Sequence, residues 1–236
     1  MSIPPVRKIE LVKDYLKRHP HQAIREGSKV IDIGGGSTYY NLLQSAVSPG
    51  ELYLLNIERA LVLGIANGGQ SIVGNALQLP FFDETWDAVI SFDMVEHLTE
   101  PASFLSEVSR ILRSDGLFIL STPNLADVYS RIAFLFGYTP FNYNPSAYKF
   151  GSLSKVEITD EGHKSVLTFK DLKGLLGHYG FRIEKPYGYP YVESLYRKLD
   201  PQQKEREVGF RNLRRALGSI LPVSLSEAML FFCTKV

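Results

Sequence analysis

The sequence has few cysteines, no long apolar run and little net charge. The first two of these absences each exclude a class of protein. Cys233 is the only cysteine in 236 residues, so the chain can form neither an internal disulfide nor a cysteine-rich zinc cluster. No segment approaches the roughly 20 apolar residues that span a bilayer, and the charged N-terminal stretch lacks the apolar core of a signal peptide. We therefore expect a soluble, cytoplasmic protein.

Apolar residues make up 44% of the chain, which is enough to build the core of one large α/β domain. Strand-like apolar stretches alternate with helix-like stretches, and this alternation predicts a parallel, doubly wound sheet. The first stretch, 29–33, has no polar alternation, which is typical of a strand covered on both faces. The predicted strands cover residues 29–33, 52–55, 71–73, 88–91, 117–121, 181–183 and 228–232.

Three helices and two insertions complete the predicted single domain. An amphipathic pattern predicts an N-terminal helix over about 6–26, lying over the sheet or over a cleft. Pro101 and a stripe of apolar residues predict a helix over 101–112, and Thr168 is a predicted N-cap. The pattern loosens over about 124–165 and 187–226, which we interpret as insertions into the domain.

A loop of one acid and three glycines follows the first predicted strand. Gly34 and Gly36 allow a sharp turn and a close approach of the main chain to a ligand, and Asp32 adds a negative charge. A dinucleotide site would need Gly-x-Gly-x-x-Gly, but the last position here is Tyr39. The carboxylate suits a cationic ligand better than a pyrophosphate, although the loop alone does not decide between them.

The loop is the first of four ordered segments that carry a family resemblance. Together they resemble the core of the class I S-adenosylmethionine-dependent methyltransferases, in the small-molecule branch that includes quinone-biosynthesis methyltransferases. The resemblance implies a Rossmann-like, three-layer αβα fold with a mostly parallel seven-stranded sheet and an antiparallel last strand. It also implies S-adenosylmethionine as the cofactor and methyl transfer to a small-molecule or lipid-like acceptor. The four segments are 30–36, 73–81, 86–98 and 104–124.

The resemblance also implies which residues contact the cofactor, and some of them depart from the family pattern. Asn56 stands where an acid usually binds the ribose hydroxyls, and Glu58 is a candidate substitute. Asn75 stands where aspartate is common, and its side-chain oxygen could accept a hydrogen bond from the adenine amine. The implied cofactor residues are Asp32, Gly34, Gly35, Gly36, Asn56, Ile57, Glu58, Asn75, Ala76, Phe92, Asp93 and Met94.

Two histidines are the candidate catalytic bases. His97 lies beside the methyl site implied by the resemblance, and His163 follows an aromatic insertion. Each has an alternative: His97 as a hydrogen-bonding residue at a helix start, and His163 as a solvated loop residue. We expect Glu96 to stabilise the start of the following helix, and we expect no metal site.

The acceptor and partners stay open at this stage. The aromatic residues from Phe134 to Phe150 either line an apolar acceptor pocket or pack beneath a long loop. Between Lys204 and Arg215, basic residues interrupted by glutamates favour a solvated helix face over a lipid or nucleic-acid contact. We expect a monomer or homodimer and no DNA partner, with peripheral membrane contact left open. The alternatives are a non-catalytic binding or assembly protein and an NAD(P)-dependent oxidoreductase.

Overall fold

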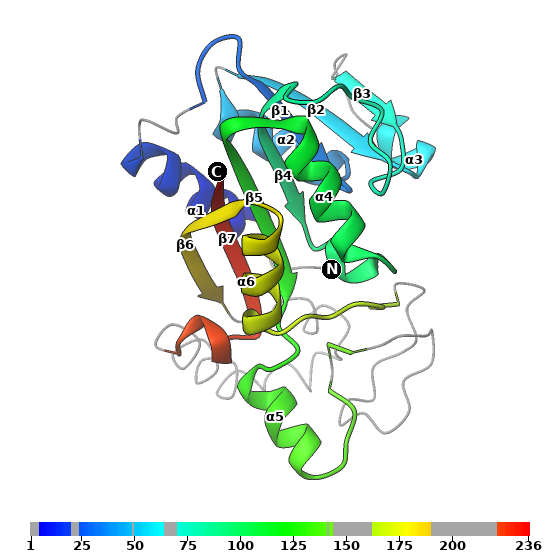
Figure 1. Ribbon diagram of the computed structural model, residues 1–236, viewed down its shortest axis with the longest axis vertical. Helices are drawn as coiled ribbons and strands as arrows, with labels where there is room; N and C mark the ends of the chain where they lie inside the picture. The colour runs from blue at the N-terminus through cyan, green and yellow to red at the C-terminus, as the bar shows by residue number, and fades with distance from the viewer. Residues whose placement is uncertain are drawn as a thin grey trace, which may run out of the picture.

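The computed structural model describes residues 5–19, 24–48, 50–63, 70–140, 142–143, 162–189 and 221–236. In these parts of the chain, seven strands form one open sheet with helices on both faces (Figure 1). The strand order is β3-β2-β1-β4-β5-β7-β6, and only β7 runs against the others. The Rossmann-like, doubly wound sheet with an antiparallel last strand is thereby confirmed. The strands are β1 (Lys29–Ile33), β2 (Glu51–Asn56), β3 (Gln70–Val73), β4 (Trp86–Phe92), β5 (Leu112–Pro123), β6 (Phe181–Tyr189) and β7 (Ala228–Lys235).

Helices cover both faces of the sheet, which makes three layers. Helices α1 and α2 share one buried cluster with the sheet, and α4 and α6 share the other. In β1, Val30 packs on the α1/α2 side while Ile31 packs on the α4/α6 side, because successive side chains of a strand point to opposite faces. The helices are α1 (Pro5–Arg18), α2 (Ser37–Val47), α3 (Arg59–Leu63), α4 (Pro101–Ile111), α5 (Val128–Leu135) and α6 (Phe169–His178), with short 3₁₀ helices η2 (Val95–His97) and η3 (Val223–Leu225).

Helix α1, the first described element, packs against β7, the last one. Tyr15 is fully buried, and its ring stacks on that of Phe232 in β7 with the centroids 3.8 Å apart. The predicted position of this helix over the sheet is confirmed, but its predicted end near residue 26 is wrong, because α1 ends at Arg18. The sequence contains the reason: His19 precedes Pro20, and a residue before proline is disfavoured in the helical conformation.

The predicted ends of the later helices agree closely with the structure. Pro101 occupies the first turn of α4, which ends at Ile111. Thr168 caps α6 as expected: its hydroxyl accepts a hydrogen bond from the Asp171 N–H, and the Asp171 carboxylate accepts one from the Thr168 N–H. These reciprocal bonds satisfy two backbone N–H groups at the start of α6.

The two predicted insertions are described only in part. The first contains α5, which lies beyond the carboxyl ends of the strands, at the bottom of Figure 1. The second begins later than residue 187, because β6 continues to Tyr189. Most of the aromatic stretch after residue 140 and the basic stretch from Lys204 to Arg215 lie outside the described residues.

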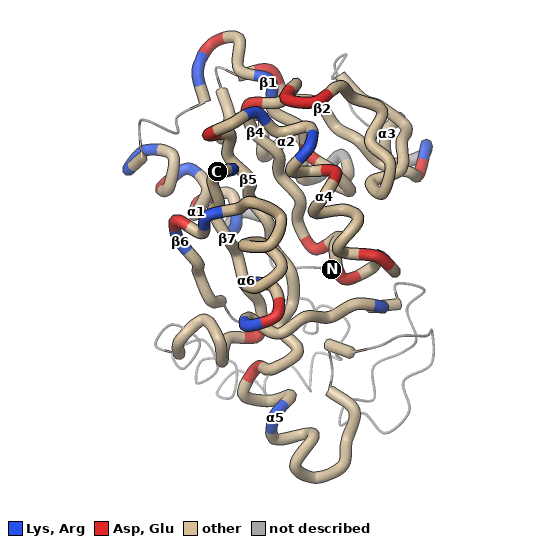
Figure 2. The backbone as a smooth tube through the Cα atoms, in the orientation of Figure 1, with Lys and Arg blue, Asp and Glu red and all other residues tan. Residues whose placement is uncertain are grey.

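Charged residues of both signs are distributed along the described chain. Acidic and basic residues are interspersed along the backbone, with no extended region of one sign (Figure 2). Among the described helices, none combines the length and apolar character needed to cross a bilayer.

Candidate functional site

The residues that the sequence singled out gather at one edge of the sheet, where the parallel strands end. β1 lies between β2 and β4, with Ile33 opposite Leu55 and Asp32 opposite Ile90. The chain crosses from one side of β1 to the other at this point, and in such sheets ligands bind beyond the carboxyl ends of the strands where the order reverses. The topology thus brings the loops after β1, β2, β3 and β4 to one place.

The glycine loop packs too tightly for any side chain at two of its positions. Gly34 has a positive φ of 84°, and a Cβ there would lie 2.2 Å from Met94 Cγ. A Cβ on Gly35 would lie 1.9 Å from Asp32 Oδ2, so the loop passes directly over that carboxylate. Helix α2 then begins after Gly36 without a side-chain cap, and the N–H groups of its first turn are suited to an anionic or polar ligand group.

Asp32 is a fully buried carboxylate beneath this loop. Neither of its oxygens accepts a hydrogen bond from the residues that the structure describes. Burial raises the pKa of Asp32 from 3.8 to about 7, because the charged form loses its hydration. Leaving a buried carboxylate without donors is costly, so this position fits a ligand that supplies a positive charge or hydrogen-bond donors.

Asn56 holds the loops after β1 and β2 together. Its side-chain N–H donates to the Gly35 carbonyl at 2.7 Å, and its side-chain oxygen accepts from the Glu58 N–H at 2.9 Å. An aspartate could not donate to the Gly35 carbonyl, which gives a physical reason for the departure from the family pattern. The Glu58 side chain is exposed at this edge, where it can still accept hydrogen bonds from a ligand.

The outer part of the edge exposes apolar side chains beside polar ones. Ile57, directly after the largely buried strand β2, is 69% exposed, and Val73, the last residue of the mostly exposed strand β3, is 53% exposed. The Asn75 side chain is exposed, and its oxygen accepts from the Leu77 N–H at 2.9 Å, within the turn that also contains Ala76. This combination suits a flat aromatic ring packed on aliphatic side chains with polar groups at its rim. Sequence analysis placed Val73 in the segment 73–81 but not among the implied cofactor residues.

The turn after β4 contains a second carboxylate, and the oxygens of this one have partners within the chain. Asp93 has a positive φ of 49°, and its N–H donates to the Ser121 carbonyl of β5 at 2.9 Å. One carboxylate oxygen accepts from the Ser121 hydroxyl at 2.9 Å, and the other forms an ion pair with Lys8 of α1. Phe92 and Met94, on either side, are buried.

Lys8 places its ammonium group inside a cage of aromatic rings. The side chain is only 1% exposed, and Nζ lies 5.5 Å from the Phe92 ring centroid and 5.8 Å from those of Tyr39 and Tyr189. Helix α1 thus closes one side of the strand edge with a buried cation. Sequence analysis missed this residue, because a lysine in an amphipathic helix normally faces solvent and nothing in its local pattern shows a buried partner 85 positions later.

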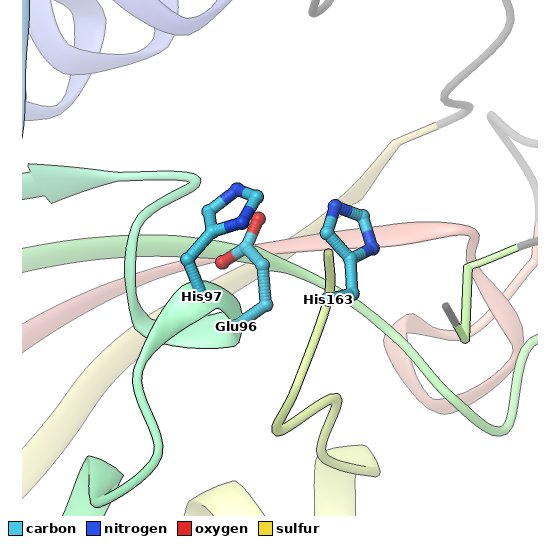
Figure 3. Close-up of side chains that lie close together, drawn as sticks. All are labelled: Glu96, His97 and His163. Atoms are coloured by element: carbon cyan, nitrogen blue, oxygen red, sulfur yellow. The ribbon is translucent and has the colours of Figure 1, made fainter. Parts of the chain in front are cut away.

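The two candidate bases lie together although they are far apart in sequence. The rings of His97 and His163 pack edge to face, with centroids 4.9 Å apart (Figure 3). The Lys164 and Ser165 N–H groups donate to the Glu96 carbonyl at 2.8 and 3.0 Å, which fixes the second segment against η2. The structure therefore brings both predicted residues to the edge where β4 ends.

Glu96 lies beneath the histidine pair and is fully buried. One carboxylate oxygen accepts from the Thr122 hydroxyl at 3.0 Å, and the other has no hydrogen-bond partner among the described residues. Burial, followed by the nearby negative charge of Asp93, raises the pKa of Glu96 to about 8. The expectation that Glu96 stabilises the next helix start is wrong, since its carboxylate turns to β5 and α4 begins without a side-chain cap.

Comparison with known proteins shows which family this chain resembles in sequence. Residues 31–120 match the model of a methyltransferase domain. The chain is 44% identical over 123 residues to a probable S-adenosylmethionine-dependent methyltransferase of Mycolicibacterium smegmatis, covering 51% of this chain and 44% of that protein. It is 25% identical over 136 residues to a ubiquinone/menaquinone biosynthesis C-methyltransferase of Haemophilus ducreyi, covering 52% and 51%. The chain thus spans about half the length of these curated relatives.

A solved structure extends the similarity of fold beyond the matched segment. The crystal structure of an S-adenosylmethionine-dependent methyltransferase from Archaeoglobus fulgidus aligns with a TM-score of 0.57 over 96% of this chain and 94% of that one. The two chains are 19% identical in sequence, so this comparison shows the shared fold alone.

Proposed function

We propose that the chain transfers a methyl group from S-adenosylmethionine to a small-molecule or lipid-like acceptor, because residues 31–120 match the model of a methyltransferase domain and the similar proteins include S-adenosylmethionine-dependent methyltransferases. The observation that carries the proposal is the buried Asp32 carboxylate beneath a glycine loop, with no hydrogen-bond donor among the described residues. A cationic ligand with donor groups would relieve that cost. The exposed apolar side chains of Ile57 and Val73 fit the adenine end of the same ligand.

The residues divide into binding roles around this edge. Asp32 and the N–H groups at the start of α2 would bind the charged amino-acid end of the cofactor. Glu58 would accept hydrogen bonds from the ribose hydroxyls. Asn56 would hold the backbone of Gly35 and Glu58 in place for this contact. The turn around Asn75 would border the adenine ring, and Met94 would close the loop from the side of β4. When bound, the cofactor supplies an electrophilic methyl group on a positively charged sulfur.

Catalysis by such a protein consists mainly of positioning and the exclusion of water. His97 and His163 are the side chains placed to take a proton from an acceptor hydroxyl, amine or carbon acid. Asp93 would keep the turn between the two binding regions in its left-handed conformation through Ser121 and Lys8. The chain itself thus needs no covalent intermediate.

Apolar side chains near the strand ends favour a lipid-like acceptor. The end of α5 exposes a run of large apolar residues, among which Leu135 is 80% and Phe136 is 70% exposed. Phe134 and Tyr138 are also exposed, so four large apolar side chains follow one another closely along the chain. One relative is named as a ubiquinone/menaquinone biosynthesis C-methyltransferase, and this name is compatible with a small-molecule or lipid-like acceptor. We also propose a cytoplasmic protein that acts as a monomer or homodimer.

The direct test is calorimetric titration of the purified chain with S-adenosylmethionine. We expect one site in the wild type and binding at least about 10-fold weaker in Asp32→Ala, because a charge-assisted contact is lost. The control is Asp14→Ala, since Asp14 forms an exposed ion pair with Arg18 on α1. Equal binding by wild type and Asp32→Ala, or no binding by either, would contradict the proposal.

The acceptor is identified by incubating the chain with methyl-labelled cofactor and a fractionated cell extract. We expect labelled product in the lipid-soluble or small-molecule fraction, detected by mass spectrometry. Cofactor binding without any labelled product would instead support a binding or assembly protein. Tight NADH binding in place of S-adenosylmethionine would support an oxidoreductase.

A further inference from the structure

We propose that Glu96, His97 and His163 form a binding site for one divalent transition-metal ion. Each residue offers one ligand atom, and the three atoms lie within 4.8 Å of one another. Figure 3 shows the carboxylate of Glu96 next to the His97 ring, with the His163 ring facing both from a separate segment. Two imidazoles and one carboxylate form a common three-ligand set for transition metals, one that leaves coordination positions open.

The first support for the site is the unsatisfied oxygen of Glu96. The residue is fully buried, and one oxygen has no hydrogen-bond partner among the described residues. The other oxygen accepts from the Thr122 hydroxyl at 3.0 Å, which holds the carboxylate in place as supporting residues do for metal ligands. A buried carboxylate oxygen is costly without a donor or a cation, and a metal ion between the histidines would satisfy it.

The second support is the orientation of the histidines. His163 Nδ1 lies 2.7 Å from the Asn142 carbonyl, and His97 Nδ1 lies 3.3 Å from the Gly162 carbonyl. A carbonyl only accepts, so each Nδ1 carries the proton, and in the neutral ring Nε2 carries the lone pair. Backbone carbonyls commonly fix metal-binding histidines in this way.

The geometry needs only a small contraction to bind an ion. Imidazole nitrogens and carboxylate oxygens bind zinc at about 2.0–2.2 Å, which places pairs of ligand atoms up to about 4 Å apart. The three ligand atoms now lie within 4.8 Å of one another, so small side-chain rotations would bring them to metal-binding distances. Nitrogen-rich sites favour zinc, iron, cobalt, nickel or copper, whereas magnesium and calcium prefer sites made of oxygen alone.

Asp93 is not part of this ligand set, although it lies three positions before Glu96. Its two carboxylate oxygens are engaged by Ser121 and Lys8. The remaining coordination positions are thus left for water or a substrate atom. This step rests on the proposed function: an acceptor hydroxyl bound there would lose its proton more readily, which favours an oxygen acceptor over an aliphatic carbon.

Metal binding is tested on the full chain without cofactor or acceptor. The protein is stripped with a chelator and titrated with Co²⁺, whose visible absorption reports nitrogen and oxygen ligation, and with Zn²⁺ by calorimetry. We expect one ion per chain in the wild type and at least about 10-fold weaker binding in His163→Ala and Glu96→Gln. Zn²⁺ should raise the Tm of the wild type and leave that of the variants unchanged.

The matched control is His178→Ala, because His178 lies exposed on α6 away from the site. This variant should bind Co²⁺ and Zn²⁺ like the wild type. Equal binding by His163→Ala and the wild type, or no saturable binding by the wild type, overturns the site. If Glu96→Gln does not fold, His163→Ala decides the question. Cofactor titration without metal separates the two proposals, since a chain that binds S-adenosylmethionine but no metal contradicts only this one.

Discussion

The two halves of the strand edge solve the same electrostatic problem with different parts of the chain. The donor half consists of the loops after β1, β2 and β3, and the acceptor half consists of the turn after β4 with the segment 162–165. Each half contains a fully buried carboxylate with an oxygen that no described residue satisfies, Asp32 in the first and Glu96 in the second. The donor half uses neighbouring residues of a motif, whereas the acceptor half joins residues 65 positions apart.

Within the acceptor half, the chain itself neutralises a third carboxylate, that of Asp93. Asp93 has a buried ammonium partner and a hydroxyl donor, so it needs no ligand. The contrast teaches that burial alone does not mark a ligand site at this edge. The informative property is a buried charge for which the chain supplies no counter-charge.

The largest expected effect comes from removing the internal counter-charge. Lys8→Met should make Asp93 resemble the other two carboxylates, because it leaves a largely buried charge without its cation. We expect the free energy of unfolding to fall by about 3 kcal/mol, measured by urea denaturation at pH 7. Lys13→Met, on an exposed position of the same helix, should change it little. A Lys8 variant as stable as this control would show that Asp93 does not depend on the pair.

The pH dependence of stability tests whether Asp32 is buried without a counter-charge. Its pKa is higher in the folded chain, so between pH 3.8 and about 7 the folded state binds more protons than the unfolded state. The contribution of this residue to stability is therefore full below pH 3.8, falls as the pH rises towards about 7 and is flat above it, with a total loss of a few kcal/mol.

The measurement is the difference in unfolding free energy between wild type and Asp32→Asn across this pH range. Because asparagine does not titrate, the difference isolates the carboxylate. The wild type should lose stability relative to the variant as the pH rises. If the difference in unfolding free energy stays constant with pH, the pKa of Asp32 is not raised by burial, and the account of this carboxylate is wrong.

Asn56→Asp tests why the donor half departs from its family pattern. The variant loses the N–H donor to the Gly35 carbonyl and places a carboxylate oxygen against it. We expect a loss of about 1–3 kcal/mol in unfolding free energy, measured by denaturation. Asn75→Asp is the control, because the Asn75 side-chain oxygen accepts from the Leu77 N–H and an aspartate oxygen can accept the same bond. An Asn56→Asp variant of unchanged stability would contradict a structural role for the amide.

The smallest effect is expected from Thr168→Ala, which affects the acceptor half from outside. The substitution removes the capping box of α6, directly after the segment that contains His163. We expect a loss of about 1 kcal/mol in unfolding free energy. Metal affinity should change much less than in His163→Ala, and an equal loss would show that the position of the segment depends on the cap.

Much of the fold and the donor half could be predicted because the signals are local. The glycine loop and the strand before it are contiguous, and Thr168 with Asp171 shows a helix start within four residues. In the acceptor half, the turn after β4 belonged to a predicted segment, but His97 and His163 were predicted only as two separate candidate bases. Their pairing depends on the Glu96 carbonyl binding a distant segment, and the Lys8 contact depends on tertiary packing of α1. Neither relation leaves a periodic pattern in the sequence.

The metal proposal departs from the sequence expectation for the same reason. Spacing rules search for ligands that recur along one segment, and here only Glu96 and His97 are neighbours. The third ligand comes from after an insertion whose residues are largely outside the described chain. The set becomes visible only once the side chains are placed in space.

The stacking of Tyr15 on Phe232 has a consequence for how the chain is made. Helix α1 leaves the ribosome long before β7, yet its most buried ring packs against that strand. At 5–20 residues per second, translation separates the two elements by on the order of 10–40 s. During that time the part of α1 that carries Tyr15 lacks its partner in β7, although α1 can already pack on α2, so this side of the helix stays exposed until synthesis of the sheet is complete.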